Sequence, residues 1–406
     1  MKRMLVLLTI LLTSTSLAQS VDFFYDKANW QSAFDETFQA APEAVKSVPY
    51  ADTSSYQAAV RSALRTPLAP GMFTWWSGYR MKDLVDAGLV ADVSDIWQKY
   101  IDAGTYSPSL ASAFSFDGKA YAIPNNLAYW IVFYNKKVFE ENGLQVPTTW
   151  EELETVNGTL KENGVTPFGQ SVDGRWPAFI YFQEFMIRQD PDFYNRLMEG
   201  EAKYTDPEVA QVFATWQEWI DAGYFSDPTI GFGTASTGAA LASEMAQGNI
   251  AMAVVGSWYA DTIVQAGLPE DQIGTFIMPN ETADLPKSVI FEAGPILVAE
   301  NSRQKEAALK DADYWMSAPA QQTWIDAMNF PPINADTTSK SELISTMVSD
   351  VNQGDYTLIN RFWEATPPDI AEAAVDEIAR FMLQQAPAEQ VMQNLQSIAD
   401  QYWAAN

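Results

Sequence analysis

Aromatic residues carry much of the binding chemistry available to this sequence. The chain of 406 residues contains 14 tryptophans and 17 tyrosines. Both side chains have a flat apolar face with one polar group, which suits them to stack on the C–H faces of a sugar ring. Trp75 and Trp76 are adjacent, so on a strand one would face inward and the other outward. Trp258 follows Gly256-Ser257, a turn that can present a side chain at the edge of a cleft. The alternative for each is packing in the core.

Planar polar side chains would have to accompany such aromatic surfaces. Asn125 and Asn126 follow Pro124, and their amides both donate and accept, which suits sugar hydroxyls. A role in a turn is the alternative. Glu292 precedes Ala293-Gly294 and could accept hydrogen bonds from two hydroxyls, or it could be an acid in contact with solvent.

Three arginines suggest a different chemistry. Arg80, Arg175 and Arg361 stand out in an acidic chain, and Arg361 lies beside Trp363 in the segment Asn360–Glu364. Guanidinium groups bind carboxylates and phosphates in a bidentate manner, so they could recognise an anionic sugar. The alternative is that they pair with carboxylates of the chain itself.

Absent residue types exclude several functions. The sequence has no histidine and no cysteine, so a Ser-His-Asp or Cys-His nucleophile and a His/Cys zinc site are impossible. Hydrolysis of glycosides by paired carboxylates remains open, but no pair stands out by spacing. We therefore expect no catalytic residues, no metal site and no cofactor.

The elements that would position these side chains follow an alternating pattern. Strands are predicted at 21–25, 45–50, 250–255, 273–278 and 296–299, with helices around 30–38, after Asp52, after Thr149, from 205 and from about 369 and 388. Such alternation favours an α/β fold. In the helix after Asp206, Trp216 and Trp219 lie on the apolar face and are predicted to be core residues.

The N-terminus and the overall charge indicate where the protein works. Met1-Lys2-Arg3, an apolar run to Leu12 and Ser16-Leu17-Ala18 have the layout of a signal peptide cleaved after Ala18. Since there is no cysteine to carry a lipid anchor, we expect a freely diffusing periplasmic protein. The chain has 52 acidic and 24 basic residues, a net charge of −28, which disfavours nucleic acids and anionic lipids as partners.

Five motifs in order resemble the family 1 extracellular solute-binding proteins of bacterial ABC transporters, a maltose-binding-protein-like and carbohydrate-binding family. They are FTWWSGYRMKDLVDAGLV at 73–90, DGKAYAIP at 117–124, FYNK at 133–136, VPTTWEEL at 146–153, and GNIAM with GSW at 248–258. The pieces span nearly all of the chain that follows the signal peptide. One departure is Gly71, which stands where the family usually has an aspartate.

This resemblance implies a two-lobed periplasmic-binding-protein fold with hinge-crossing segments and a ligand cleft between the lobes. Lobe 1 would comprise 19–125 and 293–330, and lobe 2 would comprise 130–287 and 331–406. The implied function is capture of a mono- or oligosaccharide by hinge closure and its delivery to the membrane permease subunits of an ABC importer, by a monomer that is not an enzyme. A binding protein for a polyamine or peptide, or a carbohydrate-active enzyme, are the alternatives.

The resemblance also implies roles for individual residues. Trp76 matches a tryptophan of the family's cleft, with Tyr79 and Arg80 in a polar loop beside it. Trp258 matches a tryptophan that stacks on sugar, and Trp176 matches a looser aromatic element. The predicted ligand-binding set is Trp75, Trp76, Tyr79, Arg80, Asn125, Asn126, Arg175, Trp176, Trp258, Glu292, Arg361 and Trp363.

Overall fold

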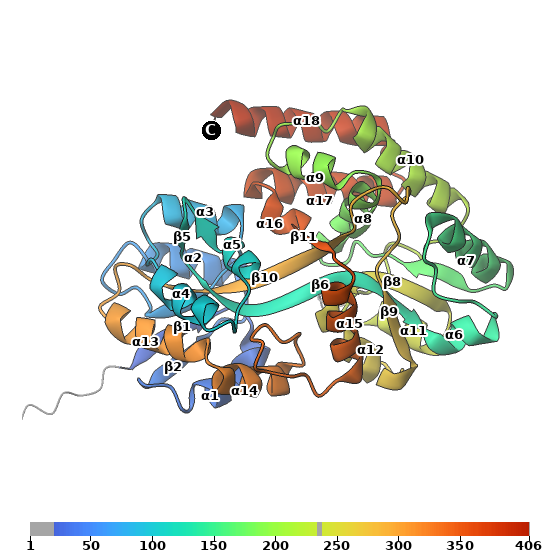
Figure 1. The fold of residues 1–406 in the computed structure, drawn as a ribbon. Coiled ribbons are helices and arrows are strands. Elements are labelled where there is room, and N and C mark those ends of the chain that lie inside the picture. The colour runs from blue at the N-terminus through green and yellow to red at the C-terminus, as the bar shows by residue number, and fades with distance from the viewer. Residues whose placement is uncertain (1–19, 234–237, 406) are drawn as a thin grey trace, which may run out of the picture.

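The computed structural model of this protein describes residues 20–233 and 238–405, so the predicted signal peptide, residues 1–18, lies outside the described residues. Helices and strands alternate along much of the chain, as the sequence predicts (Figure 1). The strands are β1 (Val21–Tyr25), β2 (Val45–Pro49), β3 (Met72–Thr74), β4 (Ser115–Phe116), β5 (Lys119–Ala120), β6 (Ile123–Asn135), β7 (Thr166–Gly169), β8 (Ile250–Gly256), β9 (Ile273–Phe276), β10 (Ser288–Val298) and β11 (Thr357–Asn360).

The helices pack around these strands (Figure 1). They are α1 (Gln31–Phe38), α2 (Thr53–Ala63), α3 (Tyr79–Asp86), α4 (Ser94–Asp102), α5 (Pro108–Ser112), α6 (Lys136–Glu141), α7 (Trp150–Glu162), α8 (Phe179–Gln189), α9 (Pro191–Met198), α10 (Pro207–Asp221), α11 (Ala240–Gln247), α12 (Ala260–Gln265), α13 (Lys305–Trp315), α14 (Ala318–Met328), α15 (Glu342–Gln353), α16 (Phe362–Ala365), α17 (Pro368–Met382) and α18 (Ala388–Ala405). In the part of the chain that the structure describes, none of them is long and apolar enough to cross a membrane.

Two long antiparallel strands, β6 and β10, join the halves of the molecule. Over the described residues the main sheet has the order β2-β1-β3-β10-β6-β8-β7, with β11 beside β10 and β9 beside β6. The C-terminal end of β10 pairs with β3, whereas the C-terminal half of β6 pairs with β8 and β9. Each of the two strands therefore runs from one side of the molecule to the other (Figure 1). We keep the names lobe 1 for the side with β1–β3 and lobe 2 for the side with β7–β9.

Each lobe has its own aromatic core. In lobe 1, α1 packs on α13 and α14, and Phe34 stacks on Trp324 with 4.6 Å between ring centroids. In lobe 2, Phe213 of α10 meets Phe381 of α17 edge-on at 4.8 Å. Trp216 and Trp219 are 0% and 2% exposed, which confirms their prediction as core residues.

Local capping signals explain where several helices begin. The Asp52 carboxylate accepts a hydrogen bond from the Ser55 N–H at 2.7 Å and starts α2. The Thr149 hydroxyl accepts from the Glu152 N–H at 3.2 Å and starts α7, as predicted. The Glu152 carboxylate reaches back to the N–H of Thr148, one residue earlier than a capping box requires.

One local prediction was wrong and another was incomplete. Tyr79 and Arg80 do not lie in a loop but form the first turn of α3. The predicted strand at 296–299 is only the end of β10, which starts at Ser288 and contains Glu292. The upstream half was missed because Glu292, Gly294 and Pro295 interrupt its apolar pattern, and pairing with β6 is what makes it a strand.

Candidate ligand-binding site

The crossing strands bring polar side chains to the region between the lobes. Glu292 of β10 lies opposite Ala128 of β6, and Gly294 lies opposite Asn126, just before a β-bulge. A Cβ at Gly294 would lie 2.2 Å from the Asn126 Oδ1, so glycine leaves the room that this amide occupies. The Asn125 Nδ2 donates to the Asn126 Oδ1 at 3.3 Å.

The other end of the Asn125 amide is an unused acceptor. Its Oδ1 is buried and has no hydrogen-bond partner among the described residues. Several other buried side-chain atoms of the described residues share this property, and water or a ligand can supply the missing partner.

Glu292 is the centre of a buried hydrogen-bonded network. The Trp258 Nε1–H donates to its Oε1 at 2.8 Å, and the Arg361 Nη1 pairs with its Oε2. Arg361 also donates from Nε to the Glu364 carboxylate at 2.7 Å. Both carboxylate oxygens of Glu292 are thus held in place by donors, and each retains a lone pair for a further donor.

Burial and charge shift the pKa values in this network. Burial raises the pKa of Glu292 above its ordinary value, and the positive charge of Arg361 opposes that rise without cancelling it. Burial alone would lower the pKa of Arg361, but the carboxylates of Glu292 and Glu364 raise it above its ordinary value. Arg361 therefore remains a cation throughout the physiological range.

Aromatic side chains of lobe 2 pack around Trp258, the tryptophan that is bonded to this carboxylate. Trp258 lies in the short turn after β8 and is half-buried. It meets Trp176 edge-on at 6.0 Å and Trp130 at 6.2 Å, and Phe232 lies at 6.4 Å. Trp258 is nevertheless only half-buried, so part of its ring remains accessible.

On the lobe 1 side, the two adjacent tryptophans differ in burial as their alternation predicts, although both lie just after β3. Trp75 is 5% exposed, and its Nε1–H donates to the carbonyl oxygen of Arg80 at 3.0 Å. Trp75 is therefore a packing residue here, whereas Trp76 is half-buried. The Lys27 Nζ lies 5.9 Å from the centre of the Trp76 ring.

Lys27 belongs to the same region, although the sequence analysis did not select it. It follows β1, and its positive charge acts on Glu292, because it is one of the groups that lower the pKa of that carboxyl. Lys27 thus links Trp76 of lobe 1 to the Glu292–Trp258 pair. Its place after the carboxyl end of a strand, where α/β proteins usually bind ligands, is the signal that could have identified it.

All three candidate arginines are engaged by carboxylates of the chain. The Arg80 Nη2 pairs with the Glu372 Oε1 at 2.9 Å, and Arg175 pairs with Asp376 at 2.8 Å and with Glu372 at 3.3 Å. Arg361 pairs with Glu292 and Glu364, as described above. The alternative that we set beside an anionic ligand, local pairing, is what the structure contains.

The remaining candidates lie at the boundary between the lobes rather than beside Glu292. The Trp363 ring stacks on Phe179 with centroids 6.0 Å apart, and the guanidinium of Arg80 lies 4.5 Å from its centre. Tyr79 meets Trp403 of α18 edge-on at 6.4 Å. Arg175 is exposed.

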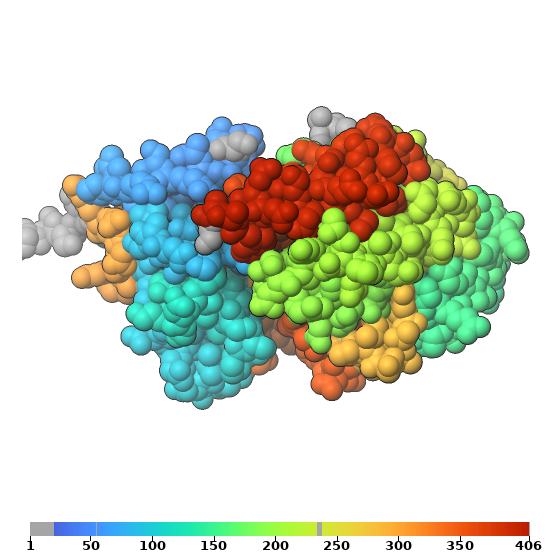
Figure 2. Space-filling model, turned by 90° about the horizontal axis from the view of Figure 1, so that it is seen from above, coloured from blue at the N-terminus to red at the C-terminus, as the bar shows by residue number. Residues whose placement is uncertain are grey.

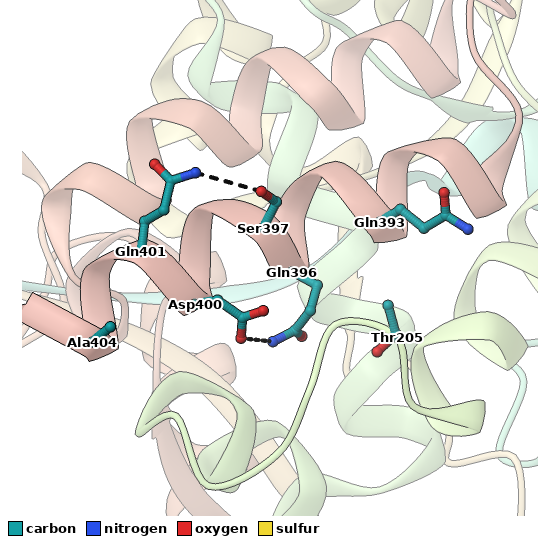
Figure 3. A pocket seen from close by; sticks show the side chains of 7 residues that line it. All are labelled: Thr205, Gln393, Gln396, Ser397, Asp400, Gln401 and Ala404. Atoms are coloured by element: carbon teal, nitrogen blue, oxygen red, sulfur yellow. Dashed lines mark hydrogen bonds between the residues drawn. The ribbon is translucent and has the colours of Figure 1, made fainter.

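The structure also has a depression that none of the predicted residues line. It has a volume of about 530 Å³ and lies along α18 (Figure 3). Its lining is Thr205, Gln393, Gln396, Ser397, Asp400, Gln401 and Ala404. Several of these side chains bond to each other, as Gln396 does to Asp400 at 2.6 Å (Figure 3). Among the described residues, no cluster of three or more acidic side chains could hold a metal ion.

Comparison with known proteins identifies the family. The sequence profile of the bacterial extracellular solute-binding proteins matches residues 32–348. The chain belongs to this family. Its members are receptors for solutes, and the fold described above is theirs.

The relatives that match in sequence share only about a quarter of their aligned residues with this chain. An uncharacterised ABC transporter extracellular-binding protein of Pyrococcus horikoshii is 26% identical over 53% of this chain and 51% of its own length. The diacetylchitobiose-binding protein of Streptomyces coelicolor is 24% identical over 69% of this chain and 64% of its own. The multiple sugar-binding protein of Streptococcus mutans is 24% identical over 63% of this chain and 65% of its own. The aligned region thus spans between half and two thirds of these relatives.

Solved structures establish the two-lobed fold. The bacterial solute receptor AcbH, described as preferring β-D-galactopyranose, superimposes with a TM-score of 0.80 at 21% identity, covering 95% of this chain and 98% of its own. A chitin oligosaccharide binding protein gives 0.79 at 20% identity, covering 94% and 98%.

Proposed function

We propose that this protein is the substrate-binding component of a carbohydrate ABC importer and captures a neutral saccharide between its lobes. The observation that carries this proposal is the arrangement around Glu292. A tryptophan from each lobe, Trp76 and Trp258, accompanies a carboxylate whose two oxygens are oriented by donors. Rings for stacking and fixed acceptors for hydroxyls are what a sugar requires.

Neutral ligands are favoured because, among the described residues, the cationic groups placed in this region each have a carboxylate partner, Lys27 with Asp26 included. Arg80, Arg175 and Arg361 are all paired with carboxylates, so an anionic sugar would have to displace one of them. A polyamine would need several carboxylates without a cationic partner, whereas Glu292 and Glu364 both bond to Arg361. The names of the similar sugar-binding proteins support the same reading.

Capture would work by closure of the hinge. Since β6 and β10 connect the lobes, rotation about these strands would bring Trp76 and Trp258 together around the ligand. The saccharide has to bind the closed state more tightly than the open state for closure to follow binding. The closed protein, a periplasmic monomer, would then deliver the sugar to the membrane permease subunits.

An enzyme is the competing class. Glu292 and Glu364 both lie against Arg361, which gives two carboxylates in one place. Both are bonded to the same guanidinium, which stabilises their ionised forms and so disfavours either of them as a general acid. Hydrolysis of aryl-glycosides that is lost in Glu292→Gln would favour the enzyme and count against a receptor.

Thermal unfolding of the mature protein with a panel of saccharides tests the proposal. The panel contains neutral mono- and disaccharides, polyols and anionic sugars, with peptides and polyamines beside them. A ligand at about 100 times its Kd stabilises the protein by about 2.7 kcal/mol, which raises Tm by a few degrees.

Two variants sharpen the panel. Trp258→Ala should abolish the shift, whereas Trp150→Ala, a half-buried tryptophan of α7 in the same lobe, should lower Tm but keep the shift. If only polyamines or peptides stabilise the protein, the fold assignment stands but the proposal of a saccharide ligand is wrong.

A further inference from the structure

The lobes touch each other directly where α3 approaches α16. Gly78, which precedes α3, has φ +63° and ψ −141°, a conformation that residues with a Cβ avoid. A Cβ at this position would lie 1.9 Å from the carbonyl oxygen of Glu364. The two backbones are therefore in contact, with no space for a ligand between them.

Arg80 continues this contact with a buried side chain. It is 6% exposed, and its Nη2 pairs with the Glu372 Oε1 of α17. Arg175 of lobe 2 pairs with the other oxygen of Glu372. One carboxylate thus binds an arginine from each lobe.

Trp363 is enclosed by the same contacts. Arg80 lies over its ring at 4.5 Å, and Phe179 stacks on it at 6.0 Å. A sugar could stack on Trp363 only after displacing one of them.

The contact between the lobes extends outward to the C-terminal helix. Trp403 of α18 meets Tyr79 of α3, and the dark red end of α18 reaches over lobe 1 in both views (Figures 1 and 2). On the other side of the crossing strands, the Asn329 amide at the end of α14 donates to Asp261 of α12 at 3.0 Å.

The contact between α3 and α16 lies next to Glu292, the proposed acceptor for sugar hydroxyls. Arg361, which holds Glu292, immediately precedes α16, and Trp363 and Glu364 lie within that same short helix. A saccharide that is bonded to Glu292 would meet α16 as soon as it extends toward α3. To pass, it would have to separate Arg80 from Glu372 and leave the buried guanidinium of Arg80 without its carboxylate partner.

We propose that Gly78, Arg80, Trp363, Glu364 and Glu372 form an interlobe wall that closes the proposed site on the side of α3 and α16 and so favours short saccharides over longer ones. The wall rests on the proposed function, because it assumes that a saccharide occupies the region of Glu292. It would determine specificity for ligand length, while Trp76, Trp258 and Glu292 bind the rings themselves.

Calorimetric titration with saccharides of increasing length tests the wall. The probes are galactose and the series glucose to maltotetraose, xylose to xylotriose, and N-acetylglucosamine to triacetylchitotriose. In the series that binds, we expect the trisaccharide to bind about 100-fold more weakly than the best shorter member. A trisaccharide that binds as tightly as its shorter members would overturn the wall but leave saccharide capture intact. If no saccharide binds, the proposed function fails and the wall fails with it.

A paired variant locates the wall. Arg80→Ala with Glu372→Ala removes both charges together, so neither is left unpaired in the interface, and Arg175 keeps Asp376. We expect the ratio of the trisaccharide Kd to the monosaccharide Kd to fall by about tenfold or more. The matched control is Arg380→Ala with Glu377→Ala, which removes a salt bridge of 2.9 Å within α17 itself. An unchanged ratio in a folded Arg80/Glu372 variant, verified by its thermal transition, would overturn the role given to these side chains.

Discussion

Replacement of Glu292 by glutamine is the most informative single change at the proposed site. The carboxylate now accepts from both Trp258 Nε1 and Arg361 Nη1. Glutamine has one acceptor oxygen, and its NH₂ group would face one of these two donors. The variant therefore loses one internal hydrogen bond in either orientation, and it loses the charge that would strengthen bonds to sugar hydroxyls.

The size of the effect follows from the kind of hydrogen bond. Bonds to charged groups contribute about 1.5–3 kcal/mol and neutral ones about 0.5–1.5 kcal/mol. A difference of about 1.4 kcal/mol for one hydroxyl raises Kd about tenfold, and two hydroxyls would raise it further. Arg361 keeps its bonds to Glu364, so the protein should still fold, with a Tm lower by a few degrees.

The assay is calorimetric titration with the sugar that gives the largest thermal shift. Glu154→Gln is the matched control, because the Trp219 Nε1–H donates to the Glu154 Oε1 at 2.6 Å between α7 and α10. The chemical change is the same, so Glu154→Gln should leave Kd unaltered. The reasoning is refuted if Glu292→Gln binds the sugar within about twofold of the wild-type Kd.

Three further predictions follow from the same contacts. Burial raises the pKa of Glu292, so this carboxylate should be protonated at a higher pH than an ordinary glutamate. Sugar affinity should therefore fall as the pH drops toward that pKa. In titrations from pH 4 to 8, the affinity of Glu292→Gln should not change with pH. Gly78→Ala places a Cβ against the carbonyl oxygen of Glu364 and should weaken sugar binding about tenfold or more. The circular dichroism spectrum should not change. Wild-type affinity in this variant would mean that α3 and α16 separate when sugar is bound. Burial raises the pKa of Asp311 from 3.8 to about 6, so its ionisation costs stability above that pH and the cost disappears as the pH falls toward 4. Asp311→Asn should therefore gain on the order of 3 kcal/mol at pH 7.5 and nothing at pH 4. Equal Tm differences at both pH values would contradict this.

Local signals in the sequence determine much of the fold. Asp52 and Thr149 cap the helices that were predicted to follow them, and the run at 250–255 is the buried strand β8. These predictions succeed because a cap or an apolar run acts over a few residues. The upstream half of β10 could not be found in this way, since its pairing with β6 joins residues more than a hundred positions apart.

The carboxylate partners of Arg80 and Arg175 are likewise residues far away in the sequence. Arg80 is 292 positions from Glu372, and Arg175 is 201 from Asp376. Sequence reasoning could name local pairing as an alternative, but it could not identify the partners. Lys27 was missed for a similar reason, because a single lysine after a strand becomes notable only when Trp76 and Glu292 are placed beside it.

The central claim, capture of a neutral saccharide between the lobes, is tested most directly by titrating neutral and anionic sugars into the mature protein in a calorimeter. The account predicts saturable one-to-one binding of at least one neutral mono- or disaccharide, with a negative heat-capacity change from buried apolar surface. Binding should disappear in Trp258→Ala and persist in Trp150→Ala. Heats of dilution alone for every neutral sugar, or binding that survives in Trp258→Ala, would contradict it.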